Sequence, residues 1–505
     1  MADAPVTDLA TAQAVIATLR AELALVQREN ASLRRELDVL CQRLYGKKSE
    51  RVDPRQLQLA LEQLANEPGA VTEPIEMDSG ETPVRGHARR RSTGRRPLPA
   101  HLPRRRVDID VAEADKHCAC GAHKTRLGEA VSEKLEYTPA SFTVIVTARA
   151  KYACQRCHDG VVEAPAPPQA LEKSLAAEGL LAYVVVAKYQ DHLPLYRLER
   201  IFAREGIDLP RSTLCGWVAD VATALTPIGD QLRREVLAAD YLQTDDTSVT
   251  VLDDPTGSYK GRLWTYLDPL GRQVVFDATR THERDGPAAV LAAFRGKLQA
   301  DAYKGYDALY ATERITEIGC WAHGRRRFVE AFVTDGSAAR MVALIQQLYQ
   351  VEHAAADVTI EARTALRQQH AVPLLAEIKA LRDELATTAL PKSPVGDAVR
   401  YLTNQWDALQ RYVDDGRLAI DNNRAENQLR VVAVGRKNWL FAGSFEGAQR
   451  AALLYSLVQS CTLVGVSPFT YLKDVLLRVA THPHQRLDQL TPRRWAATFG
   501  PTAAA

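Results

Sequence analysis

The stretch YLQTDDTSVTVL, Tyr241–Leu252, decides the fold. Its β-branched and apolar residues predict a strand, although Asp245 and Asp246 interrupt it. An acid inside an apolar strand is costly unless it is paired or binds a cation. The same conflict recurs in LQADAY, Leu298–Tyr303, where Asp301 ends another predicted strand. Because neighbouring strands can bring such acids together, the two stretches predict a sheet that gathers carboxylates.

The surrounding sequence extends this sheet in both directions. The further predicted strands are Arg262–Leu267, Gln273–Thr279, Lys297–Ala302 and Ile315–Trp321, with a helix over Glu283–Arg295. Three consecutive strands followed by a helix and another strand predict a mixed α/β sheet. Residues 324–418 are predicted to be mostly helical. Asp421 can cap a helix over roughly Asn422–Val432, and 446–464 forms an apolar-striped helix.

A third acid, Glu426, lies on the late helix, on one face with Asn423 and Arg430. Three carboxylates, Asp245, Asp301 and Glu426, suit two Mg²⁺ ions, since hard cations prefer oxygen ligands. Two such ions can activate an attacking hydroxyl and stabilise the leaving oxygen in phosphodiester chemistry. The chain has 62 acids, so the alternative for each of the three is an ordinary solvated or salt-bridged carboxylate.

The composition is that of a globular protein of several domains. The chain has 505 residues, 46% hydrophobic and 25% charged, which excludes wholesale disorder, a collagen-like fibre and a disulfide mini-protein. No apolar run approaches 18 residues and no signal peptide is evident, so we expect an intracellular, cytoplasmic protein without a membrane partner. The net charge of +2 hides nine arginines and no acid between Arg85 and Arg106, which indicates a polyanionic partner.

The N-terminal segment carries a heptad seam. The a positions are Ile16, Leu23, Asn30, Leu37 and Leu44, and the d positions are Leu19, Val26, Leu33 and Leu40. One Asn at an a position favours a parallel dimer, so residues 16–44 are predicted to self-associate. A helix packed on its own domain is the alternative. The basic linker that follows, 66–106, either tracks phosphates or is a solvated tether.

Two cysteine pairs predict a zinc site. Cys118-x-Cys120 precedes Cys154-x-x-Cys157, with predicted strands Glu133–Tyr137 and Phe142–Lys151 between the pairs. Four thiolates suit a closed structural zinc site, and a domain of about 50 residues needs such a staple. The first pair is one residue short of the usual spacing, so His117 or His158 could replace a cysteine. Four free thiols are the alternative.

Residues 171–225 are predicted to be helical. A helix over Leu195–Glu205 ends before Gly206, and Arg211, Ser212 and Thr213 begin a second helix. This is the spacing of a DNA-binding helix–turn–helix, with these three residues at the start of a recognition helix. An ordinary helical hairpin fits the spacing equally well.

Several blocks resemble the insertion sequence 66 family of transposases. Asp245-Asp246-Thr247 with Gly261-Arg262-Leu263-Trp264 is similar to their D-E-T…G-x-L-W segment, and Leu298–Tyr306 to L-Q-x-D-x-Y-x-G-Y. The later blocks are Cys320–His323 with Arg325–Phe328 (C-W-A-H-x-R-R-x-F), Asp421–Glu426 (D-N-N-x-x-E) and Arg436–Ser444 (R-K-N-x-L-F-A-G-S). The resemblance covers nearly the whole chain. Asp246 departs from the usual Glu, and Asn427-Gln428 from the usual E-R.

The resemblance implies a bacterial transposase with a ribonuclease-H-like catalytic core and a helical insertion. Its acidic triad would be Asp245, Asp301 and Glu426, with Mg²⁺ or Mn²⁺. The implied partners are double-stranded DNA, as terminal inverted repeats and target, and small accessory proteins of the same element. His323 would touch the scissile phosphate or hold the fold. The candidate phosphate contacts are Arg326, Arg430, Arg436 and Lys437, with solvated surface charge as the alternative.

The expected organisation is multidomain α/β. The segments are a coiled coil (1–65), a basic linker (66–106), a zinc-binding β domain (107–165), a helix–turn–helix domain (166–238), a first catalytic-core segment (239–330), a helical insertion (331–418), a second catalytic-core segment (419–480) and a tail (481–505). We expect the protein at the bacterial nucleoid. A DNA-binding regulator with a decayed core and a nuclease without strand transfer are the competing functions.

Overall fold

The computed structural model describes residues 142–153, 161–163, 166–172, 174–254, 257–333 and 335–500. The chain divides into two compact units, one over 71–164 and the other over the remaining residues. The predicted coiled coil, the basic linker and the four zinc-site cysteines lie outside the described residues.

The described portion of the 71–164 unit is a short hairpin. Its strands β1 (Lys151–Ala153) and β2 (Val161–Glu163) pair antiparallel, with Lys151 opposite Glu163. The strand predicted over Phe142–Lys151 is wrong for most of its length, because residues 142–150 have no regular secondary structure. Val144 and Val146 are more than four-fifths exposed, so within the described residues this apolar run has no core to pack against.

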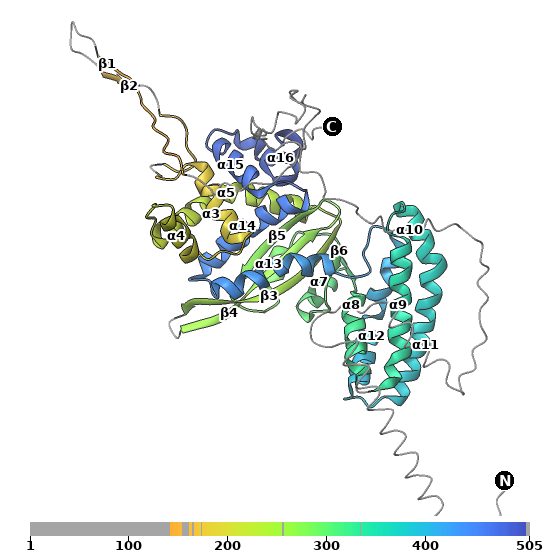
Figure 1. The fold of residues 1–505 in the computed structure, drawn as a ribbon. Helices are drawn as coiled ribbons and strands as arrows, with labels where there is room; N and C mark the ends of the chain where they lie inside the picture. Colours follow the sequence, from red (N-terminus) through yellow and green to blue (C-terminus); the bar gives the residue numbers. More distant parts are fainter. Residues whose placement is uncertain are drawn as a thin grey trace, which may run out of the picture. The chain divides into compact units, whose positions relative to one another are not determined.

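A five-stranded mixed sheet organises the larger unit (Figure 1). The strands are β3 (Tyr241–Asp254), β4 (Gly257–Asp268), β5 (Gln273–Thr279), β6 (Gly296–Gln299) and β7 (Ile315–Ile318), in the order β5-β4-β3-β6-β7. β3, β4 and β5 form an antiparallel meander, whereas β6 pairs parallel with both β3 and β7. The predicted strands are thus present, although two of them end three residues early: β7 because Trp321 already begins a helix, and β6 at Gln299, before Ala302 takes a positive φ of 68°. The helix predicted over Glu283–Arg295 is confined to Asp285–Val290.

Helices surround this sheet or pack beside it. Those before the sheet and between its strands are α3 (Glu178–Tyr189), α4 (Leu195–Arg204), α5 (Arg211–Leu237), α6 (Asp285–Val290) and α7 (Asp307–Tyr310). Those after β7 are α8 (Trp321–Phe332), α9 (Ala339–Ala354), α10 (Ile360–Leu366), α11 (Val372–Thr388), α12 (Pro394–Gln410), α13 (Asn423–Trp439), α14 (Phe445–Leu463), α15 (Pro468–Arg478) and α16 (Pro492–Thr498). None of the described helices is long and apolar enough to cross a membrane.

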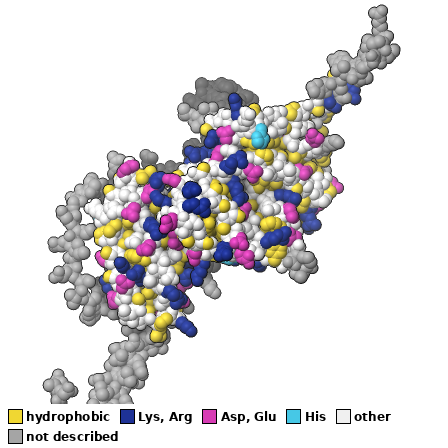
Figure 2. Space-filling view, turned by 180° about the vertical axis from the view of Figure 1, so that it is seen from behind, with side chains coloured by type: hydrophobic (Ala, Val, Ile, Leu, Met, Phe, Trp, Pro, Cys, Tyr) yellow, Lys and Arg dark blue, Asp and Glu magenta, His cyan; other side chains and the backbone are white. Residues whose placement is uncertain are grey.

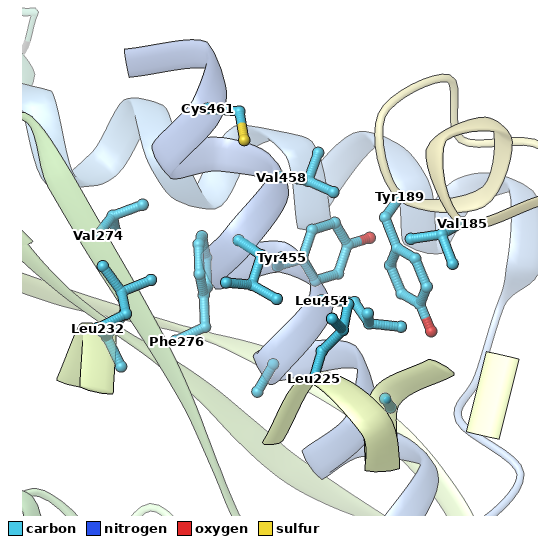
Figure 3. Packing of buried hydrophobic residues seen from close by; sticks show 14 of the residues in the cluster. Val185, Tyr189, Leu225, Leu232, Val274, Phe276, Leu454, Tyr455, Val458 and Cys461 are labelled. Atoms are coloured by element: carbon cyan, nitrogen blue, oxygen red, sulfur yellow. The ribbon is translucent and has the colours of Figure 1, made fainter. Parts of the chain in front are cut away.

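The main hydrophobic core joins the sheet to α3, α5 and α14. Tyr455 of α14 packs between Phe276 of β5 and Tyr189 of α3, with ring centroids 5.7 and 5.0 Å away (Figure 3). The outer edge of β5 is also satisfied by α14. The backbone N–H of Phe276 donates to Ser456 Oγ at 2.8 Å, and that of Val274 donates to Ser460 Oγ at 3.0 Å. An edge strand that would otherwise expose its backbone donors is therefore covered.

The helix–turn–helix spacing is present but is not an isolated module. α4 ends at Arg204, Gly206 takes φ 77°, and α5 begins after Pro210. α5 runs for 27 residues, and its second half, from Leu225 to Val236, buries side chains in the core shared with the sheet. Leu214, Trp217 and Val221 of its first half are buried in the same core, so a recognition surface on α5 would use exposed residues such as Arg211 and Ser212.

Helices α8, α9, α11 and α12 form a second hydrophobic cluster. The fully buried Arg367 closes it. Its guanidinium donates to both carboxylate oxygens of Glu352 at 2.7 and 2.6 Å. It also donates to the carbonyl oxygens of Tyr412, Asp415 and Leu418 at 2.7, 3.0 and 2.9 Å. All five donors of the guanidinium are thus used, and the segment after α12 is tied to the helices before it.

We predict that Arg367→Met destabilises this helical cluster by about 3–5 kcal/mol, because it leaves Glu352 and three carbonyl groups without their partner. Arg367→Lys should fail to restore stability, since one ammonium group cannot reproduce the planar fork. Native-state hydrogen exchange of amides in α9 and α11 measures the loss. Arg340→Met, at an exposed position of α9, is the matched control and should change the exchange free energy by less than about 0.5 kcal/mol. Equal effects of the two methionine variants would contradict the assigned role of Arg367.

Candidate active site

The register of β3 against β6 aligns the residues that precede Asp245 and Asp301. Gln243 lies opposite Gln299, and both side chains are fully buried. Gln243 Nε2 donates to Gln299 Oε1 at 2.8 Å, so the two side chains point the same way. Since strand side chains alternate with a period of two, Asp245 lies on the same face of β3 as Gln243, and Asp301 follows two residues after β6 ends at Gln299.

The two glutamines also fix the segment that precedes α13. Gln299 Nε2 donates to the carbonyl oxygens of Gly319 and Ala419, each at 2.9 Å. Gln243 Nε2 donates to the carbonyl oxygen of Asp421 at 2.9 Å. Backbone from the end of β7 and backbone from residues 419–421 therefore meet on the same pair of buried amides.

The Asp421-Asn422-Asn423 run then starts α13 in one orientation. Asn422 is fully buried, and its Nδ2 donates to the Thr244 carbonyl oxygen at 3.3 Å. Asp421 accepts from the Asn423 N–H at 3.2 Å and from the Tyr349 hydroxyl at 3.0 Å. The N-cap of α13 is Asn422, and the predicted capping residue, Asp421, precedes it and accepts the first N–H of the helix, that of Asn423. α13 extends to Trp439 rather than Val432. The first turn of α13 carries Glu426.

Glu426 lies against α8. Its Oε1 is 3.6 Å from His323 Nε2, and its Oε2 is 3.9 Å from Arg326 Nη2. His323 Nδ1 lies 3.2 Å from Cys320 Sγ, which also accepts from the Asn422 N–H at 3.5 Å. Burial lowers the pKa of His323, although Glu426 and Asp301 oppose that shift. Glu426 Oε1 is buried without a hydrogen-bond partner among the described residues, which is costly unless another group satisfies it.

The three acids interact through space. Burial, followed by repulsion from Asp301 and Glu426, raises the pKa of Asp245 to about 8, and only the Asp246 N–H, donating at 2.8 Å, opposes the shift. Mutually repelling carboxylates at one place are the situation that a divalent cation relieves. No group of three or more acidic, His or Cys side chains within the described ranges already converges on one metal position. The donor set fits ions shared by two carboxylates that keep several waters, as Mg²⁺ does.

Asp246 points to the opposite face and has its own partners. Arg262 Nη1 lies 2.9 Å from Asp246 Oδ2, and His282 Nε2 lies 3.1 Å from Asp246 Oδ1. Tyr303 stacks on the His282 ring with centroids 4.6 Å apart. Neither His282 nor Tyr303 was predicted from the sequence. Strand alternation could have shown that Asp246 faces away from Asp245, but no spacing rule links His282 to it.

The predicted DNA-contacting residues divide by environment. Arg430 and Lys437 are exposed on α13, and Arg326 is exposed beside Glu426. Arg436 is directed inward, with Nη1 donating to Thr247 Oγ1 at 2.8 Å and to the Ser248 carbonyl oxygen at 2.5 Å, so it ties α13 to β3. Arg211 and Ser212 are exposed in the first turn of α5, whereas Thr213 is half-buried. The structure thus brings His323 and Arg326 to Glu426 and places the α5 residues on a separate element.

Comparison with known protein families finds matches along most of the chain. The family model "Transposase IS66 family" covers residues 173–450. Further models match over 32–107 ("Transposase C of IS166 homeodomain"), 115–158 ("zinc-finger binding domain of transposase IS66") and 456–493 ("IS66 C-terminal element").

Proteins of Sinorhizobium fredii (strain NBRC 101917 / NGR234) align over nearly the whole chain. Uncharacterized protein y4jD is 33% identical over 497 residues, covering 92% of this chain and 94% of y4jD. Uncharacterized protein y4qI is 33% identical over 506 residues, covering 96% of this chain and 92% of y4qI. With matches from the zipper and zinc-finger segments to the C-terminal element, the chain belongs to the IS66 family of transposases.

Proposed function

We propose that this transposase binds the terminal inverted repeats of a bacterial insertion sequence and catalyses metal-dependent DNA cleavage and strand transfer. Asp245, Asp301 and Glu426 are the proposed catalytic acids. The proposal is supported by the Gln243–Gln299 pair, which aligns β3 and β6 two residues before Asp245 and Asp301, and by the Asn422 contact that anchors the start of α13, where Glu426 lies.

The architecture supports a ribonuclease-H-like core. Asp245 lies within the central strand β3 of a mixed sheet, Asp301 follows the neighbouring strand β6 by two residues, and α13, which packs on β3, carries Glu426. Helices α8 to α12 lie in the chain between Asp301 and Glu426, as a helical insertion requires. We also propose the segment boundaries expected from the sequence, with one exception. Residues 166–238 are not a separate domain, because their helices share a hydrophobic core with the sheet.

Asp245, Asp301 and Glu426 would hold Mg²⁺ or Mn²⁺, which when bound supplies an activated hydroxyl and stabilisation of the leaving oxygen. The chain's own groups prepare that position. Gln243, Gln299 and Asn422 fix the backbone that carries the carboxylates, so that little reorganisation is needed when DNA arrives. Arg326 and His323 orient Glu426 from α8 and lie where a phosphate group would approach it.

DNA binding is proposed to use several regions of the chain. Arg430 and Lys437 contact phosphates along α13, and Arg211, Ser212 and Thr213 contact them at the start of α5. Arg436 acts mainly by holding α13 on β3. Two DNA ends would be bound and paired by three N-terminal segments, together with small accessory proteins of the element. These segments are the zinc domain with Cys118, Cys120, Cys154 and Cys157, the basic linker and the dimerising segment 16–44.

Asp301→Asn should abolish cleavage and joining while leaving end binding within about threefold, because it removes a proposed metal ligand rather than a DNA contact. The assay mixes the full chain with labelled duplex carrying the gene's flanking inverted repeats, a plasmid target and Mg²⁺. Asp307→Asn, at an exposed acid of α7 six residues on, is the matched control and should retain joining. Parallel loss of binding and chemistry in Asp301→Asn would refute the assignment. Cleavage without joining by wild type would favour a nuclease.

The purified chain should contain about one zinc ion per molecule, since four cysteines suit one tetrahedral structural site. Cys154→Ser with Cys157→Ser should lose that zinc and make residues 107–165 sensitive to protease, because folding of so small a domain is coupled to its metal. Cys215→Ser, at an exposed cysteine of α5, should keep the zinc. Zinc content and proteolysis that are the same in all three proteins would rule out this site.

A further inference from the structure

One face of α13 is exposed along its whole length, and its fully exposed positions include no acid, although the half-buried Glu426 borders them in the first turn. The exposed residues are Asn423, Asn427, Arg430, Val434 and Lys437, at spacings of four, three, four and three. Such spacing puts them on a single helix face, named here the α13 stripe. The opposite face, with Ala425, Leu429 and Val432, is buried in the main core. Figure 1 shows α13 lying across the sheet, so the stripe begins beside Glu426 and leads away from it.

The stripe ends in an exposed apolar pair, Leu440 and Phe441, named here the tip. Leu440 is 64% exposed and Phe441 45% exposed. Leu440 has φ 67°, in the left-handed region that residues other than glycine rarely adopt. Such strain persists only where the surrounding structure imposes it, and it gathers at functional sites.

The backbone at the tip is held firmly. The Leu440 N–H donates to the Arg436 carbonyl oxygen at 2.9 Å. The Ala442 N–H donates to the Thr250 carbonyl oxygen at 2.8 Å, and the Leu252 N–H donates to that of Ala442 at 3.1 Å. The tip is therefore fixed to β3, and its two side chains are presented to solvent on a rigid turn.

Cations from three elements border the tip. Lys437 precedes it on the α13 stripe. Arg197 of α4 donates to Asn438 Oδ1 at 3.3 Å, and Lys260 of β4 donates to Thr250 Oγ1 at 2.8 Å. Of the nearby acids, Asp253 pairs with Arg280 and accepts the Phe445 N–H, and Glu446 lies in the first turn of α14.

This chemistry favours DNA over a protein partner. The core of a protein–protein interface is depleted in charged residues, whereas an apolar wedge flanked by lysine and arginine suits a kinked duplex. Figure 2 shows the molecule from behind, where basic and acidic side chains are interspersed.

We propose that the α13 stripe is a track for duplex DNA and that the tip is a wedge that enters the base stack of the bound end. The 14 residues from Glu426 to Leu440 span about 21 Å of helix at 1.5 Å per residue. At about 3.4 Å per base pair, the wedge acts roughly six base pairs from the scissile phosphate. This inference rests on the proposed function, because it assumes that DNA passes the three acids.

The test measures base unstacking without chemistry. The full chain, in buffer with zinc but without Mg²⁺, is titrated onto duplexes of the gene's flanking inverted repeat that carry 2-aminopurine at successive positions from the end. Wild type should raise the fluorescence several-fold at positions about six base pairs from the cleaved end. Leu440→Ala with Phe441→Ala should remove most of that rise and change the Kd for the duplex by less than about fivefold.

Leu477→Ala with Phe469→Ala, at exposed apolar positions of α15, is the matched control and should behave as wild type. A mismatch placed at the wedged step should restore joining by the tip variant in Mg²⁺, since the step is then already unstacked. Wild-type binding without any rise in fluorescence, or a rise that the tip variant retains, would overturn the wedge but not the proposed function. Failure of wild type to bind the duplex would overturn both.

Discussion

The buried hydrogen bond between Gln243 and Gln299 is the contact on which the site depends. It joins β3 to β6 inside the sheet, two residues before each aspartate, and the spare donors of the same amides hold the backbone of Gly319, Ala419 and Asp421. A buried polar network of this kind is strong where its groups are satisfied, as are the Nε2 donors of both amides, whereas Gln243 Oε1 has no hydrogen-bond partner among the described residues. One pair of amides therefore sets both the strand register and the point from which α13 departs.

The helices that follow β7 lie outside the sheet and hold the position of Glu426. α8 carries His323 and Arg326 to Glu426, and the Trp321 indole donates to the Leu409 carbonyl oxygen at 2.9 Å, so α8 is locked to the end of α12. Arg367 then ties the segment after α12 to the earlier helices. The insertion between Asp301 and Glu426 is thus a folded support with its own core, which brings a distant stretch of the chain back to the sheet.

The sequence predicted the elements of the fold that follow from local pattern. Alternation and β-branched residues were sufficient for β3, β4 and β5, and apolar spacing for α14. The strand over Phe142–Lys151 failed because its apolar residues need a packing surface that local pattern cannot supply. The alignment of the segments that carry Asp245 and Asp301 could be inferred only once the register of β3 against β6 was known. The inward direction of Arg436 and the partnership of Asp246 with His282 depend on tertiary contacts that no spacing encodes.

We propose that Asp245, Asp301 and Glu426 together form a divalent-cation site. The most direct measurement is anomalous diffraction from crystals of the full chain soaked in Mn²⁺, which reports ion positions without any assay of activity. We expect Mn²⁺ bound between these carboxylates, with Asp245 and Asp301 sharing an ion and Glu426 within coordinating distance of one. Crystals in which Mn²⁺ binds elsewhere, or leaves these three side chains without an ion at saturating concentration, would contradict it.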